Sequence, residues 1–239
     1  MPTTFYTKWD EIGTKTYHTG CDRGVLYVSN PSGTGSSAWG DGVAWSGLRS
    51  VSESPDGAEE QAFYADNIKY LSLRGAENFG GSIGCYDTPE EFDACDGTAQ
   101  LLSGFKGITI KQQSRLPFCF TYRTLKGNDQ VGDNYGYLIH LVYNATASPS
   151  SRENQSVNES PSPLELSYEF KTTPIEVAGF KPTSHIIIDT TSEDFKATGG
   201  QAKLTAIESW LYGTAATTEG GTGTPGKILL PTDLLTIMQ

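Results

Sequence analysis

Apolar and polar residues alternate with a period of two along much of this chain, a pattern typical of β-strands with one buried face. The clearest stretch is 164–171, where every second residue is apolar. The stretch 137–143 is instead apolar at nearly every position, which predicts a central strand covered on both faces. Other strands are predicted at 26–29, 43–48, 68–73, 82–86, 108–111, 116–123 and 185–191. Gly, Asn and Pro separate these strands, so we predict a mainly β fold, a β-sandwich or barrel.

Two segments carry helical signals. Residues 88–91 read Thr-Pro-Glu-Glu, a capping box with Pro at the first helical position, and predict a short helix. Between 202 and 212, apolar residues recur at helical spacing and Gly213 follows as a C-cap signal. The apolar stripe consists of Leu204, Ile207 and Leu211. We expect this second helix to pack its stripe over an open face of the sheet.

Small and polar residues dominate three segments that we predict to be irregular: 30–42, 147–163 and 214–227. The last of these precedes an apolar segment in which Leu234 and Leu235 follow a cap-like Thr-Asp pair. We expect this segment to dock on a subunit, its own or an adjacent one. The predicted organisation is an N-terminal arm at 1–22, a β-domain at 23–213, and a flexible linker with a C-terminal arm at 214–239.

The 239 residues include 28 acidic and 17 basic side chains, for a net charge of −11. Tight binding of nucleic acid requires basic side chains that neutralise phosphates, so we expect none, and no hold on an anionic membrane surface. We expect no membrane span and no secretory signal, because no apolar run is long enough. Without an export signal, the four cysteines are expected to be free, partly buried thiols: Cys21, Cys85, Cys95 and Cys119.

Charge is spread unevenly along the sequence. Residues 49–96 contain 11 acidic and 3 basic residues, a net charge of 3 − 11 = −8, whereas residues 97–126 contain 5 basic residues and no acidic one. The fold either presents one acidic and one basic surface, or interleaves these charges in space. We favour interleaving, because strands from distant segments pair in a β fold.

The motifs that resemble chemical sites are incomplete. Residues 221–227 have the spacing of a phosphate-binding loop, but Ile228 stands where Ser or Thr would hold magnesium. Residues 33–38 resemble a dinucleotide fingerprint that no helix follows. His18 and Cys21 have the spacing of half a metal site without a second half. We therefore predict no catalytic residues, no cofactor and no metal, and we expect His140 to be a satisfied residue of its strand.

A series of short motifs resembles the major tail proteins, or tail tube proteins, of long-tailed bacteriophages. The motifs lie in order at 42–48, 53–58, 64–71, 89–92, 95–97, 122–124, 127–129, 135–137, 140–143, 160–161 and 172–174. The resemblance as a whole covers roughly residues 23–212, most of the chain. The resemblance implies a β-sandwich or barrel-like tube fold, to which the sequence patterns add one packed helix, a short helix and two terminal arms. The N-terminal 22 residues and the length of the linker at 214–227 depart from the family pattern.

The resemblance also implies a structural role in the virion rather than catalysis. Subunits would form homohexameric rings that stack into a tube, through which DNA leaves the capsid without being tightly bound. The tape measure, tail terminator and tail tip proteins would be further partners. Localisation in the virion tail, after assembly in the bacterial host cytoplasm, follows from the same resemblance.

Stacked rings require two different interaction faces on each subunit. The segment 49–66, between two predicted strands, has a net charge of 1 − 5 = −4 and a turn signal at Pro55 and Gly57. We expect it to reach a neighbouring subunit or ring. The residues predicted to make contacts between subunits or rings are Glu53, Pro55, Asp56, Gly57, Glu59, Glu60, Leu234 and Leu235.

Two other classes of function remain open. A secreted carbohydrate-binding or adhesin-type β-sandwich could use an aromatic platform, for which the tryptophans are candidates: Trp9, Trp39, Trp45 and Trp210. The lack of a signal sequence and the unpaired cysteines oppose this interpretation. An enzyme with an unrecognised site is the third possibility.

Overall fold

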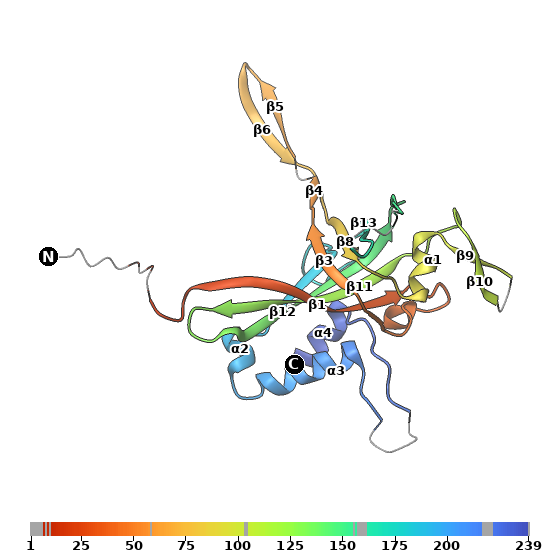
Figure 1. The fold of residues 1–239 in the computed structure, drawn as a ribbon. Coiled ribbons are helices and arrows are strands. Elements are labelled where there is room, and N and C mark those ends of the chain that lie inside the picture. Colours follow the sequence, from red (N-terminus) through yellow and green to blue (C-terminus); the bar gives the residue numbers. More distant parts are fainter. Residues whose placement is uncertain are drawn as a thin grey trace.

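The computed structural model describes residues 7, 9, 11–57, 59–102, 105–154, 156, 162–216 and 222–238. Its central element is an eight-stranded antiparallel sheet with the order β2-β1-β11-β12-β13-β8-β3, in which β14 also pairs with β12 (Figure 1). These strands are β1 (Thr16–Val28), β2 (Val43–Trp45), β3 (Leu48–Glu53), β8 (Gly80–Cys85), β11 (Phe118–Asn128), β12 (Gly132–Ala147), β13 (Leu166–Thr172) and β14 (His185–Asp189). The predicted mainly β fold class is confirmed.

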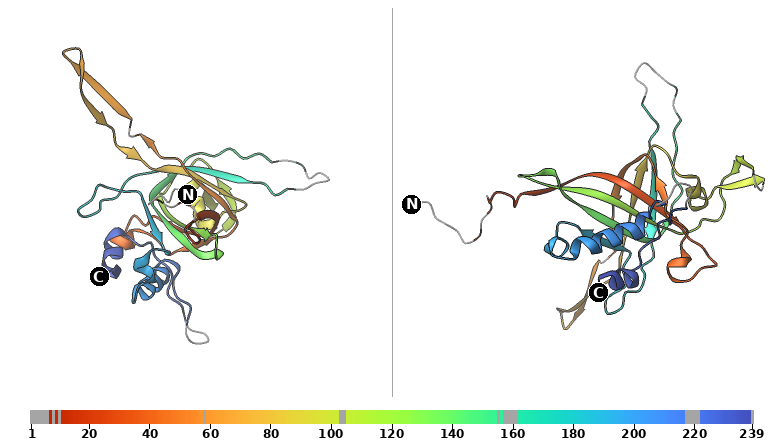
Figure 2. Two further views of the ribbon diagram at one scale, coloured as in Figure 1. Left: turned by 90° about the vertical axis from the view of Figure 1, so that its left-hand side faces the viewer. Right: turned by 90° about the horizontal axis from the view of Figure 1, so that it is seen from below.

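The sheet curls into a barrel-like form. Strands β2 and β3 lie at opposite ends of the strand order, yet only Ser46 and Gly47 separate them in the sequence. The two edges of the sheet therefore approach each other, as the view along the sheet shows (Figure 2, left). Gly47 has a φ of +80°, which permits the sharp turn. The single strand predicted over 43–48 is thus wrong, because this turn divides it.

The first hydrophobic core fills the inside of the curled sheet. Alternate residues of β11 point into it, so Phe118, Phe120 and Tyr122 are buried side by side on one face. The short helices η2 (Glu90–Phe92) and α1 (Asp93–Asp96) contribute Phe92 and Cys95 to this core. The helix predicted from residue 88 is therefore present, but Pro89 is its N-cap and no side chain caps it, contrary to the expected capping box.

The second hydrophobic core lies between the outer face of the sheet and three helices, α2 (Glu193–Lys196), α3 (Gly200–Tyr212) and α4 (Pro231–Met238). The predicted stripe of α3 is buried against β12 residues that include Ile139 and Leu141. Helix α3 ends before Gly213, as predicted. Because Leu138 and Val142 are buried on the opposite face of β12, this strand is covered on both sides, which confirms its prediction as a central strand.

The segment before α4 belongs to the second core. Ile228 and Leu229 are both 0% exposed. The hydroxyl of Tyr143 donates a hydrogen bond to the carbonyl oxygen of Leu229 (2.7 Å), and the indole N–H of Trp210 donates to that of Ile228 (3.3 Å). Residues 228–230 therefore pack on their own domain.

Strand β1 begins at Thr16, which pairs with Asn128 of β11. Residues 16–22, which the sequence assigned to an N-terminal arm, are thus part of the main sheet. Their side chains are mostly exposed and polar, so the sequence lacked the apolar alternation that identifies a strand. Nearly all of residues 1–10 lie outside the described residues.

Short ribbons project from the barrel (Figures 1 and 2). The longest pairs β5 (Glu60–Ala65) with β6 (Ile68–Arg74), and β4 (Asp56–Gly57) pairs with β7 (Glu77–Asn78) at its base. A second ribbon pairs β9 (Ala99–Leu102) with β10 (Phe105–Ile110). The segment 49–66 is therefore largely strand rather than loop, and the strand predicted at 68–73 lies outside both cores. The remaining helix, η1 (Gly35–Ala38), falls within the irregular segment 30–42.

All four cysteines are free thiols, as predicted, and three of them are buried. Burial raises the pKa of Cys21 and Cys85 to about 11 and that of Cys95 to about 12.

A thiol with a pKa of 11 is only about 0.1% thiolate at pH 8, and the thiolate is the reactive form. We therefore expect a thiol reagent to react with the native protein at least ~100-fold more slowly than with a free peptide thiol. Unfolding without reductant should expose four titratable thiols, whereas fewer than four would reveal a disulfide.

Candidate functional site

Exposed apolar side chains are concentrated on the two projecting ribbons. Among the described residues, ten of the twenty exposed large hydrophobic residues lie there. Six are on the β5–β6 hairpin: Phe63, Tyr64, Ile68, Tyr70, Leu71 and Leu73. Four are on the β9–β10 hairpin: Leu101, Leu102, Phe105 and Ile108. Apolar surface gathered in this way is typical of contact sites for other macromolecules.

The β5–β6 hairpin, which we call the arm, is built as a tight two-stranded ribbon. Ala65 pairs with Ile68, so the turn consists of Asp66 and Asn67 alone. Both turn residues have positive φ values, +50° and +61°, as a type I′ turn requires. This turn matches the twist of the strands and closes the ribbon at its tip, far from the barrel (Figure 1).

Both faces of the arm are apolar. Successive residues of a strand point to opposite faces, so Ile68 and Tyr70 lie on one side of β6, and Leu71 and Leu73 lie on the other. Every residue of β6 is exposed. An isolated two-stranded hairpin is at best marginally stable in water. The arm therefore presents two apolar faces that neither core covers.

The residues predicted from the sequence lie at the base of the arm and on α4. Glu53 is the last residue of β3, Asp56 and Gly57 form β4, and Glu60 is the first residue of β5. Glu60 forms an ion pair with Lys69 on the opposite strand of the arm (2.5 Å). Pro55 and Glu59 are exposed between these strands. On α4, Leu234 is half-buried against the second core and Leu235 is 49% exposed. The structure thus brings the first six residues together and leaves the two leucines elsewhere.

The sequence prediction missed the apolar part of the arm. Tyr64 and Tyr70 are 72% and 71% exposed, more than most aromatic residues of the described chain. The sequence pattern around these residues resembles that of a strand with one face in the core. It therefore gave no sign that neither core covers this hairpin. The Asp-Asn pair at 66–67, which favours a type I′ hairpin turn, was the one available signal.

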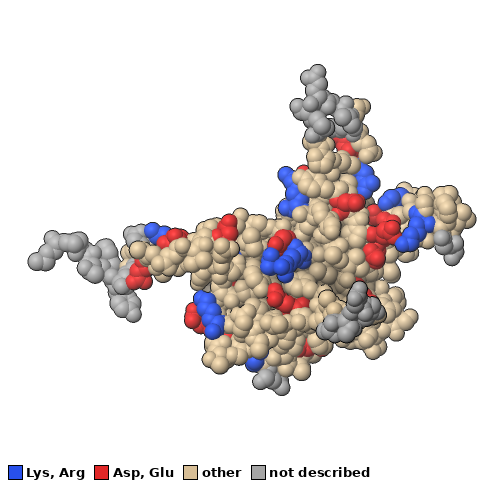
Figure 3. All heavy atoms as spheres, turned by 60° about the horizontal axis from the view of Figure 1, so that its bottom comes forward, with Lys and Arg blue, Asp and Glu red and all other residues tan. Residues whose placement is uncertain are grey.

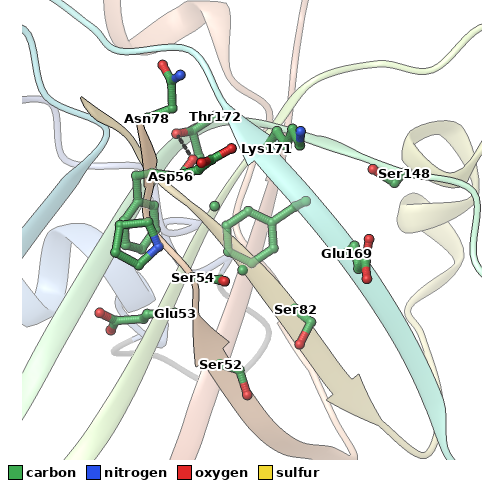
Figure 4. Close-up of a pocket in the computed structure, with 15 residues that line it drawn as sticks. Ser52, Glu53, Ser54, Asp56, Asn78, Ser82, Ser148, Glu169, Lys171 and Thr172 are labelled. Carbon is green, nitrogen blue, oxygen red and sulfur yellow. Dashed lines mark hydrogen bonds between the residues drawn. The ribbon is translucent and has the colours of Figure 1, made fainter. Parts of the chain in front are cut away.

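A pocket of about 720 Å³ lies where the arm leaves the sheet (Figure 4). Its walls come from β3, β8 and β13 and from the base of the arm. Three of its four charged lining residues are acidic, namely Glu53, Asp56 and Glu169, and the fourth is Lys171. Polar and charged side chains therefore outnumber apolar ones in the lining, unlike on the arm beyond it.

Next to this pocket, Glu53 meets two histidines that the sequence places far apart. His140 Nδ1 lies 3.2 Å from His185 Nε2 and 3.4 Å from Glu53 Oε1. Tyr122 donates a hydrogen bond to the same Glu53 oxygen (2.7 Å), and its ring stacks on that of His140. Burial lowers the pKa of His140 to about 4, so its imidazole is neutral at pH 7 and carries a proton on only one ring nitrogen. His140 is thus partnered in its strand, as expected, but within a cluster of possible metal ligands that was not foreseen.

Basic side chains of the segment 97–126 are paired within the chain. The ion pairs are Lys106 with Glu90, Lys111 with Asp96 (3.2 Å), Arg123 with Asp22 (2.6 Å) and Lys126 with Asp189 (2.6 Å). Arg115 donates hydrogen bonds to the carbonyl oxygens of Asp96 and Ala147 (both 3.2 Å). Figure 3 shows acidic and basic side chains next to one another on one face of the molecule. Charges of the acidic and basic segments therefore interleave.

The tryptophans do not form the platform that the carbohydrate-binding alternative requires. Trp45 is 3% exposed in the first core and donates a hydrogen bond to the carbonyl oxygen of Asp87 (3.0 Å). Trp39 packs against the second core, and Trp210 bonds to Ile228 there. Trp9 is 69% exposed, but it belongs to neither of the cores with which the other three make contact.

Among the described helices, none is long and apolar enough to span a membrane.

No protein-family model matches the chain, and no curated protein matches it either. Solved structures with some likeness come from contractile injection systems. One is from the sheath-tube complex of an extracellular contractile injection system, with 11% identity over 70% of this chain and 88% of the other, at a TM-score of 0.28. Another is from the baseplate of the anti-feeding prophage, with 8% identity over 77% and 97% and a TM-score of 0.29.

A third is from the tube-terminating cap of the anti-feeding prophage, with 10% identity over 78% of this chain and 96% of the other, and a TM-score of 0.27. TM-scores well below 0.5 do not establish a shared fold.

Proposed function

We propose that this chain is a structural subunit of a phage tail, in which copies polymerise as stacked hexameric rings into the tail tube. The observation that carries the proposal is the arm, a two-stranded ribbon with apolar side chains on both faces and no core behind it. A second copy of the chain is the simplest partner for such a ribbon, because every subunit of a polymer offers the same arm and the same receiving surface.

The arm suits an open assembly better than a closed dimer. Its apolar faces differ from the surface of the barrel, so an arm seated on the barrel of the next copy makes a heterologous contact. Contacts of this kind close into rings or continue as filaments, depending on the rotation between subunits. In a tube of stacked rings, the contacts within a ring close, and the contacts between rings continue along the tube. The hexameric number comes from the resemblance of the sequence motifs to tail tube proteins.

The charge of the chain fits the proposed passage of DNA. A tube that bound phosphates at every ring would retain DNA with a steep dependence on salt concentration. The net charge of −11 has the opposite sign to that of a DNA-binding surface, and the five basic residues of 97–126 already have partners within the chain. We propose that the surface facing the channel carries a net negative charge.

Light scattering on purified protein, followed by negative-stain microscopy, tests the proposal. We expect the mass to rise with protein concentration and the micrographs to show rings or tubes. A protein that stays monomeric at every concentration would contradict the proposal, and binding of glycans by that monomer would favour the carbohydrate-binding class instead.

A further inference from the structure

The cluster of Glu53, His140 and His185 lies where three strands meet. Glu53 is the last residue of β3, His140 lies in the middle of β12, and His185 is the first residue of β14. His185 pairs with Val142 in the antiparallel register, so it is the diagonal neighbour of His140 on the same face of the sheet. Strand pairing therefore fixes the two imidazoles beside each other before any ligand binds.

Two distances within this cluster match those between the ligands of a tetrahedral metal ion. A tetrahedral zinc ion with bonds of about 2.0–2.1 Å separates its ligand atoms by roughly 3.3–3.4 Å. The separations from His140 Nδ1 are 3.2 Å to His185 Nε2 and 3.4 Å to Glu53 Oε1. The three residues each offer one ligand atom, and these ligand atoms lie within 4.8 Å of one another. Small rotations of the side chains would direct all three toward one ion, without movement of the strands.

We propose that Glu53, His140 and His185 bind one divalent transition-metal ion, with Zn²⁺ as the best match. Two imidazole nitrogens and one carboxylate oxygen form a ligand set that zinc accepts, and a fourth position remains for water or another donor. Magnesium and calcium are poorer candidates, because they prefer oxygen ligands throughout.

Residues around the cluster support the ligands in the way that metal sites require. Thr124 Oγ1 lies 3.0 Å from His140 Nε2, so an Nε2–H that donates to it leaves the lone pair of Nδ1 directed at the cluster. Tyr122 donates to the oxygen of Glu53 and orients the carboxylate. Phe79 packs against His185 with ring centroids 4.4 Å apart and ring planes tilted by 31°. Each ligand therefore has a neighbour that holds its position.

The site is open to ions from one side. The side chain of His140 is only 7% exposed, whereas that of Glu53 is 38% exposed and lines the polar pocket at the base of the arm. An ion can therefore enter through the pocket and bind Glu53 first. A bound ion would tie the end of β3, from which the arm begins, to β12 and β14. This inference stands independently of assembly into a tube.

The test is metal titration of the chelator-treated protein. We expect calorimetry with Zn²⁺ to give one ion per chain, and Co²⁺ to give the visible absorption of a tetrahedral site. His185→Asn should weaken Zn²⁺ binding at least ~100-fold, since it removes a ligand outright, whereas loss of an outer partner costs about 10–100-fold. His18→Asn is the matched control, because His18 is exposed on β1 and is not one of the three ligands, so its loss should change affinity far less.

Folding of each variant is checked by circular dichroism and urea denaturation, and Glu53→Gln, at a more exposed position, provides a second ligand variant. The proposal is overturned if the wild-type protein binds no stoichiometric ion. It is also overturned if His185→Asn and Glu53→Gln, both folded, bind Zn²⁺ as tightly as the wild type, or if His18→Asn loses affinity to the same extent.

Discussion

Replacing Tyr64 and Tyr70 together by Ser should give a folded protein that no longer assembles. Both side chains are more than 70% exposed, so their loss should change the free energy of unfolding of the subunit by no more than about 0.5 kcal/mol each. Central aromatic residues of an interface, in contrast, contribute about 2 kcal/mol or more each. Two such losses weaken each subunit contact about 1,000-fold. Light scattering measures assembly, and urea denaturation measures stability.

The matched control is Phe180→Ser. Phe180 is 78% exposed but lies on neither projecting hairpin, so its substitution removes an equally exposed aromatic ring from another place. We expect this variant to assemble like the wild type. Normal assembly of the Tyr64→Ser/Tyr70→Ser protein would show that the arm does not carry the subunit contact.

Truncation after Gly226 should unfold the subunit itself. It removes Ile228 and Leu229, both fully buried in the second core, and the acceptor of the Tyr143 hydroxyl. Complete burial of one such aliphatic side chain contributes about 1.5–3 kcal/mol, and the remaining cavity adds to the loss. Two of them represent much of the ~5–15 kcal/mol by which a domain is stable. Urea denaturation followed by circular dichroism measures the loss.

Single substitutions separate this effect from gross truncation. Leu229→Ala should lower the free energy of unfolding by about 2–5 kcal/mol, as for other buried leucines. Leu235→Ala, on the half-exposed part of α4, should lower it by less than about 1 kcal/mol. Equal effects of the two substitutions would contradict the burial of residues 228–230 in the second core.

Periodicity predicted the parts of the fold whose partners are in the same chain. The continuous apolar stretch of β12 and the helical stripe of α3 face each other across the second core, so each was recognisable from its own sequence. The strand at 68–73 was recognised as a strand but not as part of an arm. The apolar residues of this strand predict that it packs against another surface. The sequence does not say whether that surface belongs to the same subunit or to another molecule.

Other features depend on pairing that the sequence does not reveal. Glu53 was predicted as a contact residue, and the contacts predicted for it and the other seven residues stay predictions. The register that sets Val142 opposite His185 brings the two histidines together, and the curl of the sheet brings Glu53 of β3 to them. Neither histidine has a metal-ligand spacing in the sequence, because 44 residues separate them. The cluster could therefore be found only after the strands were placed.

The most direct test of the proposed assembly is a cryo-electron microscopy map of the particles that the purified protein forms. We predict that the arm of each subunit lies on a neighbouring copy, with Tyr64 and Tyr70 buried in the contact. A map of rings or tubes in which both tyrosines remain in solvent would contradict the account.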